Sequence, residues 1–382
     1  MHFELTQEQK MIQDAARDFA EKEIAPVAAQ LDKDEKFPTE LVKKLGQLGM
    51  MGMTIPIEYG GGGVDTLSYI VALEQVARAC ASTGIIMSVN NSLVCCPIHE
   101  FGTDAQQKKY LVPLAKGEKL GAFSLTEPNA GTDAGNQQTT AVDAGDHYVL
   151  NGTKIFVTNG DVADTIIITA STDKAKGAKG ISAFLVEKGW PGFKVGSIEH
   201  KLGIRASGTA ELVLTDLKVP KENVLGSPGD GFKIALRALD GGRIGVAAQA
   251  LGIAQAALEV AVKYAKQRVQ FGKTIAEFQA VQWMIAEMAV DVEAARLLVY
   301  RAAVAKDTKK VFSKEAAMAK LFASQIASRC ASDAIQIHGG YGYSREYPCE
   351  RHYRDARITQ IYEGTSEVQK MVIAAMVLRE FA

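Results

Sequence analysis

The chain has 382 residues, of which 47% are hydrophobic and 23% charged, a balance typical of a soluble globular protein with two or three domains. Its 43 Lys and Arg residues nearly match its 44 Asp and Glu residues, so it lacks the basic surplus that binds nucleic acid. Five scattered cysteines are too few for a disulfide framework and favour a reducing, cytoplasmic setting. The charged N-terminal segment predicts no targeting peptide, and no stretch reaches the ~20 apolar residues of a membrane span.

The first part of the chain, residues 1–120, is predicted to be helical. Thr6 and Gln9 have the spacing of a capping box, in which each side chain caps the other residue's N–H group. Further helices are predicted from about Thr39 and over residues 68–81. Four consecutive glycines at 60–63 lie between them and predict a loop.

Residues 121–230 contain short β-rich runs and predict a β-barrel or sandwich domain. The runs at 147–150 and 153–158 flank Asn151 and Gly152, and Asn-Gly is the preferred pair for a two-residue type I′ turn, so we expect a β-hairpin there. Further strands are predicted at 165–170, 181–186 and 211–214.

Residues 231–382 return to helical periodicity. Long helices are predicted at 244–268, 278–306 and 313–337. Their apolar positions are too widely spread for a surface helix, which has a single apolar stripe, so these helices should be buried on several sides. Gly339 follows the third run and is a typical helix stop. The predicted architecture is therefore helical, then β, then helical.

The usual cofactor motifs are absent from the sequence: there is no G-x-G-x-x-G, no P-loop and no Cys/His spacing of a metal site. Three Gly- and Thr-rich segments remain, at 125–133, 336–342 and 361–367. Their backbone N–H groups and hydroxyls could bind a pyrophosphate or the edge of a flat heteroaromatic ring. Taken singly, each is better explained as a structural loop.

Taken together, these segments resemble the two signatures of the acyl-CoA dehydrogenase family. The run Leu125-Thr-Glu-Pro-Asn-Ala-Gly-Thr-Asp133 resembles the first, and Gln336, Gly339, Gly340, Gly342, Glu346, Arg351 and Asp355 have the spacing of the second. The resemblance covers essentially the whole chain and is strongest to the short-chain, butyryl-CoA branch. It implies an N-terminal helical domain (1–120), a middle β domain (121–230) and a C-terminal four-helix bundle (231–382), assembled as a homotetramer, a dimer of dimers, with FAD as cofactor.

The resemblance assigns the catalytic base to Glu363, in Ile-Tyr-Glu-Gly-Thr-Ser, against the alternative of a solvated loop residue. In the family, the enolate oxygen of the substrate is bound by the backbone N–H of this residue and by a ribityl hydroxyl of FAD. Other branches carry the base in a motif such as Leu-Asp-x-Glu-Arg, but the corresponding run 239–243 has Gly242 at that position.

The resemblance also implies binding residues. Arg268, Gln270 and Phe271 are expected to reach the FAD of a neighbouring subunit. Asp240 is expected to line the CoA channel, and the alternative for this residue is helix capping. For Arg268, the alternative is complementing a helix dipole. The cofactor set is Phe123, Leu125, Thr126, Thr132, Phe156, Val157, Thr158, Arg268, Gln270, Phe271, Gln279, Gln336, Gly339, Gly340, Thr365 and Glu367, and the substrate set is Thr132, Asp240, Arg243, Tyr362 and Gly364.

The implied function is FAD-dependent dehydrogenation of a short-chain acyl-CoA to the trans-2-enoyl-CoA, or the reverse reduction, with electrons exchanged through an electron-transferring flavoprotein. Residues 82–96 contain no Arg or Lys that could hold a distal carboxylate, which favours an uncharged alkyl tail. Two alternatives are an acyl-CoA oxidase that reacts with O2 and a non-catalytic flavin-binding interaction protein of the same fold. We expect no metal, nucleic-acid or membrane partner.

Overall fold

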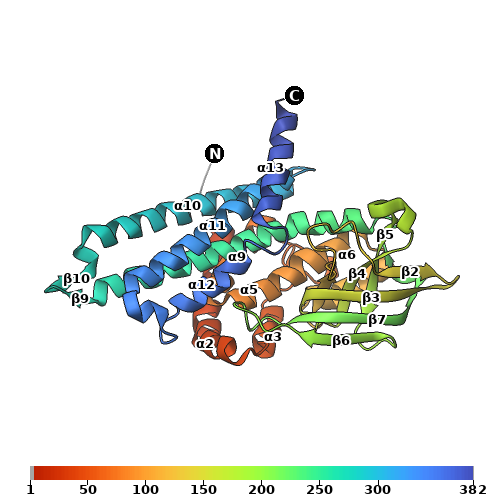
Figure 1. Ribbon diagram of the computed structural model, residues 1–382, viewed down its shortest axis with the longest axis horizontal. Helices are drawn as coiled ribbons and strands as arrows, with labels where there is room; N and C mark the ends of the chain where they lie inside the picture. The colour runs from red at the N-terminus through yellow and green to blue at the C-terminus, as the bar shows by residue number, and fades with distance from the viewer. Residues whose placement is uncertain (1–3, 382) are drawn as a thin grey trace.

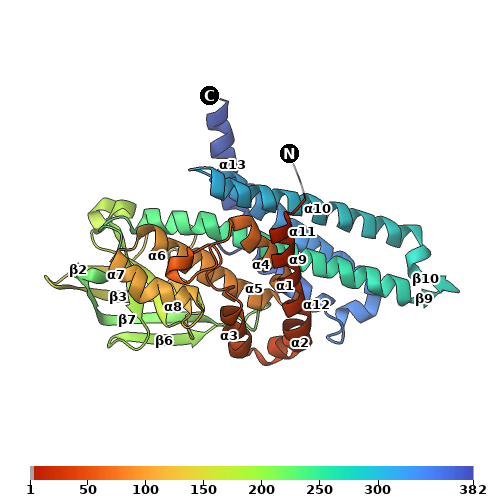
Figure 2. The same ribbon diagram turned by 180° about the vertical axis from the view of Figure 1, so that it is seen from behind.

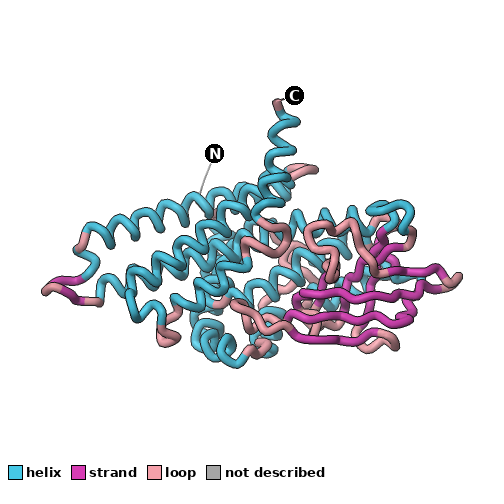
Figure 3. The backbone as a smooth tube through the Cα atoms, viewed as in Figure 1, coloured by secondary structure: helices cyan, strands magenta, loops and turns pink. Residues whose placement is uncertain are grey.

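The computed structural model describes residues 4–381, and its elements follow the predicted order of helices, sheet and helices (Figures 1 and 3). The predicted multidomain class, with α-helical, β and α-helical parts, is confirmed. The sheet lies at one end of an elongated molecule, and the long C-terminal helices extend from it to the opposite end (Figures 1 and 2). The domain boundaries stay predictions.

The N-terminal helices begin with the predicted capping box. The Gln9 N–H donates to Thr6 Oγ1 at 3.2 Å, and the Thr6 N–H donates to Gln9 Oε1 at 3.0 Å. In the glycine loop, the Gly62 N–H donates to the carbonyl of Gly52 at 3.0 Å, which holds the loop against the preceding turn. The helices are α1 (Gln7–Phe19), α2 (Ala25–Asp34), α3 (Thr39–Gln47), α4 (Thr66–Ala79), α5 (Ala81–Ser88), the π-helix η3 (Val89–Cys95), α6 (Cys96–Phe101), α7 (Asp104–Gln106) and α8 (Val112–Ala115).

The middle strands form one connected mixed sheet in the order β6-β7-β3-β2-β4-β5-β8, with β1 pairing in parallel with β4. Its core consists mainly of aliphatic side chains from the long central strands. The strands are β1 (Gly121–Ser124), β2 (Thr140–Asp143), β3 (His147–Thr158), β4 (Thr165–Ser171), β5 (Ile181–Glu187), β6 (Phe193–Ile198), β7 (Thr209–Pro220) and β8 (Val224–Leu225).

The predicted hairpin at Asn151-Gly152 is wrong, because β3 runs without a turn from His147 to Thr158. The pair lies instead at an irregularity in the pairing of β3 with β7. The Asn151 side chain exchanges two hydrogen bonds with Asp216 on β7, at 3.1 and 2.8 Å. Gly152, with a φ of +152°, approaches Thr139 so closely that a Cβ would lie 2.4 Å from its Oγ1. The permissive backbone of Asn-Gly therefore serves a bulge and a close contact.

The C-terminal helices are built around one long central helix, α9, which packs against α4, α10 and α11. Small side chains, largely Ala and Gly, make this close packing possible. At 1.5 Å per residue its 37 residues extend about 55 Å. The elements are α9 (Gly231–Gln267), the small hairpin of β9 (Val269–Gln270) and β10 (Lys273–Thr274), α10 (Gln279–Thr308), α11 (Ser313–His338), α12 (Cys349–Ile358) and α13 (Ser366–Glu380).

Two stretches, Ala81–Phe101 and Gly231–Gln267, are long and apolar enough to cross a membrane by length and composition. Their most apolar windows are 94% and 78% buried inside the protein. Both are therefore explained as core helices.

Candidate active site

Glu363 lies in the short connection between α12 and α13, in a turn with unusual backbone geometry. Its φ is +52°, and that of Gly364 is +92°, so both residues adopt left-handed conformations. For a residue with a side chain this costs about 1–2 kcal/mol. Such strain, held by the surrounding structure, is typical of functional positions.

The Glu363 carboxylate extends from this turn to α9, where glycine makes room for it. A Cβ on Gly242 would lie 2.0 Å from Glu363 Oε2 and 2.7 Å from Leu93 Cδ2 of η3. Oε2 is buried and has no hydrogen-bond partner among residues 4–381. The carboxylate therefore occupies a slot that exists because position 242 lacks a side chain.

The electrostatics of this slot suit a proton acceptor. Burial raises the pKa of Glu363 from 4.5 to about 7, while the positive charges of Lys320 and Arg243 oppose the rise. A base works best when its pKa lies near the operating pH. The backbone N–H of Glu363 has no acceptor within the described part of the chain, so it is available as a donor.

Most of the predicted substrate residues lie near this carboxylate, and the helix-capping alternative for Asp240 is wrong. Asp240 does not cap a helix, because α9 begins nine residues earlier at Gly231. Its carboxylate instead forms an ion pair with Arg243 at 2.6 Å and accepts a hydrogen bond from Ser313 of α11. Tyr362 donates through its hydroxyl to Gln249 of α9. Four of the five predicted substrate residues thus lie at the junction of α9, α11 and the Glu363 turn.

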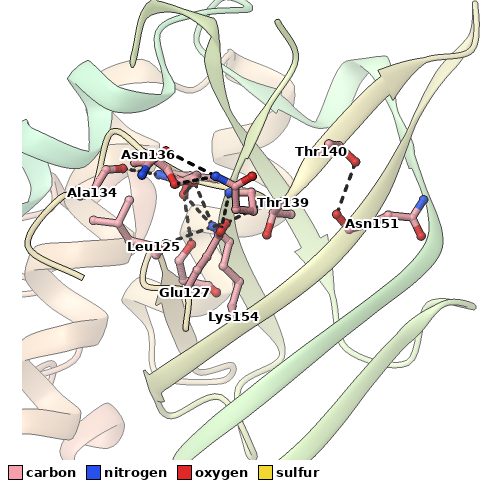
Figure 4. Close-up of polar contacts among 12 residues, drawn as sticks. Leu125, Glu127, Ala134, Asn136, Thr139, Thr140, Asn151 and Lys154 are labelled. Carbon is pink, nitrogen blue, oxygen red and sulfur yellow. Dashed lines mark hydrogen bonds and ion pairs between the residues drawn. The ribbon is translucent and has the colours of Figure 1, made fainter. Parts of the chain in front are cut away.

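The segment that follows β1 is held by a buried ion pair that sequence reasoning missed (Figure 4). Lys154 of β3 and Glu127 are both nearly fully buried, with Nζ 2.8 Å from Oε1. Lys154 also donates to the carbonyl of Leu125 at 3.0 Å and to Gln137 Oε1 at 2.9 Å. Glu127 accepts from the N–H of Thr139 at 3.1 Å. Both ends of the 125–139 segment, which contains the predicted signature, are therefore fixed by the pair.

This anchoring brings predicted cofactor residues of two strands together. The Ile155 N–H donates to the carbonyl of Thr126 at 2.9 Å, so Leu125 and Thr126 lie beside β3. The next β3 residue, Phe156, sits in a bulge with a φ of +56° and is 60% exposed. Val157 instead points into the sheet core, so only its backbone could reach a ligand. Phe123 is buried in β1, Thr158 ends β3, and Thr132 lies at the exposed tip of the 125–139 segment.

A second group of predicted cofactor residues lies at the opposite end of the molecule, near β9 and β10 (Figure 1). Phe271, at the tip of the β9–β10 hairpin, is 94% exposed, and Gln279 begins α10 on the surface. The other five line one cleft of about 540 Å³, which they share with Tyr264, His338 and Tyr341: Arg268, Gln270, Gln336, Gly339 and Gly340.

Thr365 and Glu367 form a third group, in a smaller cleft of about 270 Å³ at the start of α13. Arg357 and Lys370 line the same cleft and supply positive charge. One chain therefore does not bring all predicted cofactor residues into one site. Within residues 4–381 there is no group of three or more His, Cys, Asp or Glu side chains that could hold a metal ion.

Three family models match the chain in order: the acyl-CoA dehydrogenase N-terminal domain over residues 6–118, the middle domain over 122–217 and the C-terminal domain over 229–378. The chain belongs to the acyl-CoA dehydrogenase family.

Its relatives include short-chain members of that family. A Clostridium acetobutylicum protein named "acyl-CoA dehydrogenase, short-chain specific" is 56% identical, over 99% of this chain and 100% of that protein. The butyryl-CoA dehydrogenase structure from Megasphaera elsdenii is 54% identical with a TM-score of 0.97, covering 99% of this chain and 100% of that one. A chain in the structure described as the electron transferring flavoprotein of Acidaminococcus fermentans is 56% identical with a TM-score of 0.98, over the same shares.

Proposed function

We propose that this chain is an FAD-dependent dehydrogenase of short-chain acyl-CoA thioesters such as butyryl-CoA, with Glu363 as the base. The observation that carries the proposal is the Glu363 carboxylate, whose Oε2 is buried without a hydrogen-bond partner among residues 4–381 and whose pKa is raised to about 7. Such a group can take the α-proton of a thioester and hold it near neutral pH. The free N–H of the same residue can donate to the thioester oxygen as negative charge develops there.

The residues present fit the flavin on which this family depends. Phe156 is a large aromatic held on the surface by an unfavourable backbone conformation, which a flat ring ligand would explain. Leu125, Thr126 and Thr158 would lie with it along the ring. When bound, the flavin would accept the hydride that leaves C3 of the thioester. Glu363 would take the proton from C2.

An uncharged, short acyl tail fits the walls of the site. Residues 82–95 are buried and include no Lys or Arg, and Leu93 lies against the carboxylate slot. This segment offers no partner for a distal carboxylate, whose burial without a counter-charge would be costly. The similarity to short-chain and butyryl-CoA dehydrogenases supports four-carbon substrates.

A homotetramer, a dimer of dimers, would complete the cofactor site. The cleft at Arg268 lies next to β9, at the opposite end of the molecule from β3, which carries Phe156 (Figure 1). A second copy would therefore supply this cleft to the FAD bound on the sheet. Arg268 would meet the pyrophosphate, for which a guanidinium is well suited. Helix α13 projects from the rest of the molecule (Figure 2). Met371 and Leu378 on this helix and Phe381 just after it are exposed apolar side chains that a neighbouring subunit would cover. We further propose a cytoplasmic location and electron exchange with an electron-transferring flavoprotein, as the similarity to the Acidaminococcus chain suggests.

Anaerobic titration of the FAD-loaded protein with butyryl-CoA tests this function. We expect butyryl-CoA to bleach the flavin absorbance and Glu363→Gln to abolish the bleaching. An unbleached wild-type flavin would refute the proposed function, and bleaching in Glu363→Gln would refute the assigned base. Rapid reaction of the reduced protein with O2 would identify an oxidase instead.

A further inference from the structure

Lys320 on α11 is a buried lysine that the reaction described above does not use. Its side chain is fully buried, and its Nζ donates to the carbonyl of Gly364 at 2.7 Å. Within residues 4–381 it forms no ion pair with a carboxylate at 4.0 Å or less. Burying an ammonium group without a close counter-ion is unfavourable. A compensating role is therefore expected.

The carbonyl that Lys320 contacts belongs to the left-handed turn that carries Glu363. Gln369 of α13 donates to the same Gly364 oxygen at 2.8 Å and to the Glu363 carbonyl at 3.3 Å. Two helices thus hold a backbone conformation that Glu363 would not favour by itself. Gln369 supplies hydrogen bonds alone, whereas Lys320 supplies a hydrogen bond and a charge.

The charged and titratable groups around the carboxylate show why the charge of Lys320 matters. Arg243 faces Glu363 from α9, but its charge is matched by Asp240 at 2.6 Å. Tyr69 faces it from α4, with a pKa raised by burial, and Tyr362 lies beside it with a pKa raised for the same reason. The remaining acidic neighbour of Lys320 is Glu367 of α13, and it lies on the surface.

We propose that Lys320 is a positioning residue for the base: its ammonium group fixes the turn that carries Glu363 and places an unmatched positive charge beside the carboxylate. This inference rests on the proposed role of Glu363. Burial lowers the pKa of Lys320 to about 8, about one unit above that of Glu363, so Lys320 is mostly in the ammonium form where Glu363 is half ionised. The charge of Lys320 then favours the ionised form of Glu363, while the carboxylate oxygens stay free of a hydrogen bond from Lys320.

Paired variants separate the anchor from the charge. Lys320→Met removes both, and Gln369→Met removes only hydrogen bonds. We expect kcat with butyryl-CoA to fall about 10- to 100-fold in each, because a displacement of about 1 Å costs about 100-fold. Only Lys320→Met should move the rising limb of the pH profile of kcat/KM, upward by about one pH unit. Lys320→Arg, which keeps the charge, should retain the wild-type midpoint, and Lys310→Met at an exposed position serves as the control.

Wild-type kcat and pH midpoint in Lys320→Met would overturn the inference, and so would an equal pH shift in Gln369→Met. If Lys320→Met fails to assemble, Gln369→Met tests whether anchoring of the turn matters for the rate, and wild-type kcat in that variant would refute the need for an anchor. If the wild-type protein oxidises no acyl-CoA, the proposed function fails separately, and amide hydrogen exchange over residues 359–368 tests the anchor. Faster exchange in the two anchor variants than in Lys310→Met supports it, and equal exchange refutes it.

Discussion

Replacing Gly242 by alanine tests the slot that receives the Glu363 carboxylate. The new Cβ would lie 2.0 Å from Oε2, and ordinary contact begins at 3.4 Å, so the carboxylate must retreat by about 1.4 Å. A displacement of about 1 Å at a reacting group costs about 100-fold in rate. We therefore expect Gly242→Ala to lower the rate of anaerobic flavin reduction by butyryl-CoA about 100-fold.

Stability should change much less than activity in this variant. Alanine in a helix interior gains about 1 kcal/mol over glycine, and the contact with Leu93 at 2.7 Å offsets this by about 1–3 kcal/mol. The neighbouring Gly241 provides a matched control, since its Cβ would meet nothing closer than Lys306 Nζ at 3.9 Å. Stopped-flow reduction rates of Gly242→Ala within twofold of those of Gly241→Ala would refute the reasoning.

Three further predictions follow from the same contacts. The kcat/KM for butyryl-CoA should rise with pH to a plateau with a midpoint near 7. Glu363 must lose its proton to act as a base, and its pKa is raised from 4.5 to about 7. A midpoint near 4.5 would contradict the buried site. Lys154→Met should lower the free energy of unfolding by about 3–5 kcal/mol, measured by urea denaturation, since it leaves the Glu127 charge buried, and adding Glu127→Gln should recover part of the loss. Arg354→Ala should lower the free energy of unfolding by about 3 kcal/mol, measured in the same way. The Arg354 side chain joins Asp32 of α2, the carbonyl of Leu202 and Glu350 of α12. A loss below about 1 kcal/mol, as for an exposed ion pair, would contradict that role.

The sequence predicted those parts of the fold that depend on local patterns. The capping box at Thr6 and the helix stop at Gly339 were predicted because both signals lie within a few residues of the element they delimit. Asn151-Gly152 was misread for the opposite reason. Its partner Asp216 lies 65 residues away, and the choice between a turn and a bulge depends on that tertiary contact.

For the site too, local sequence patterns could be predicted and contacts between distant residues could not. Glu363 was identified by resemblance, whereas its supports Lys320 and Gln369 were missed, because a helical lysine or glutamine is usually solvated. For Lys320 a signal existed in the sequence: it shares a helix face with Ala316, Ala323 and Ala327, all buried. No sequence pattern indicated that its Nζ would meet the carbonyl of Gly364, since that contact spans 44 residues.

The central claim, that the Glu363 carboxylate removes a proton from C2 of the thioester, is tested most directly by isotope exchange. The FAD-loaded protein is incubated anaerobically with butyryl-CoA in D2O, and the recovered thioester is analysed by mass spectrometry and NMR. We predict deuterium at C2 with the wild-type protein and with Glu222→Gln, a surface control, and none above background with Glu363→Gln. Deuterium entering C2 at the wild-type rate in Glu363→Gln would contradict the account.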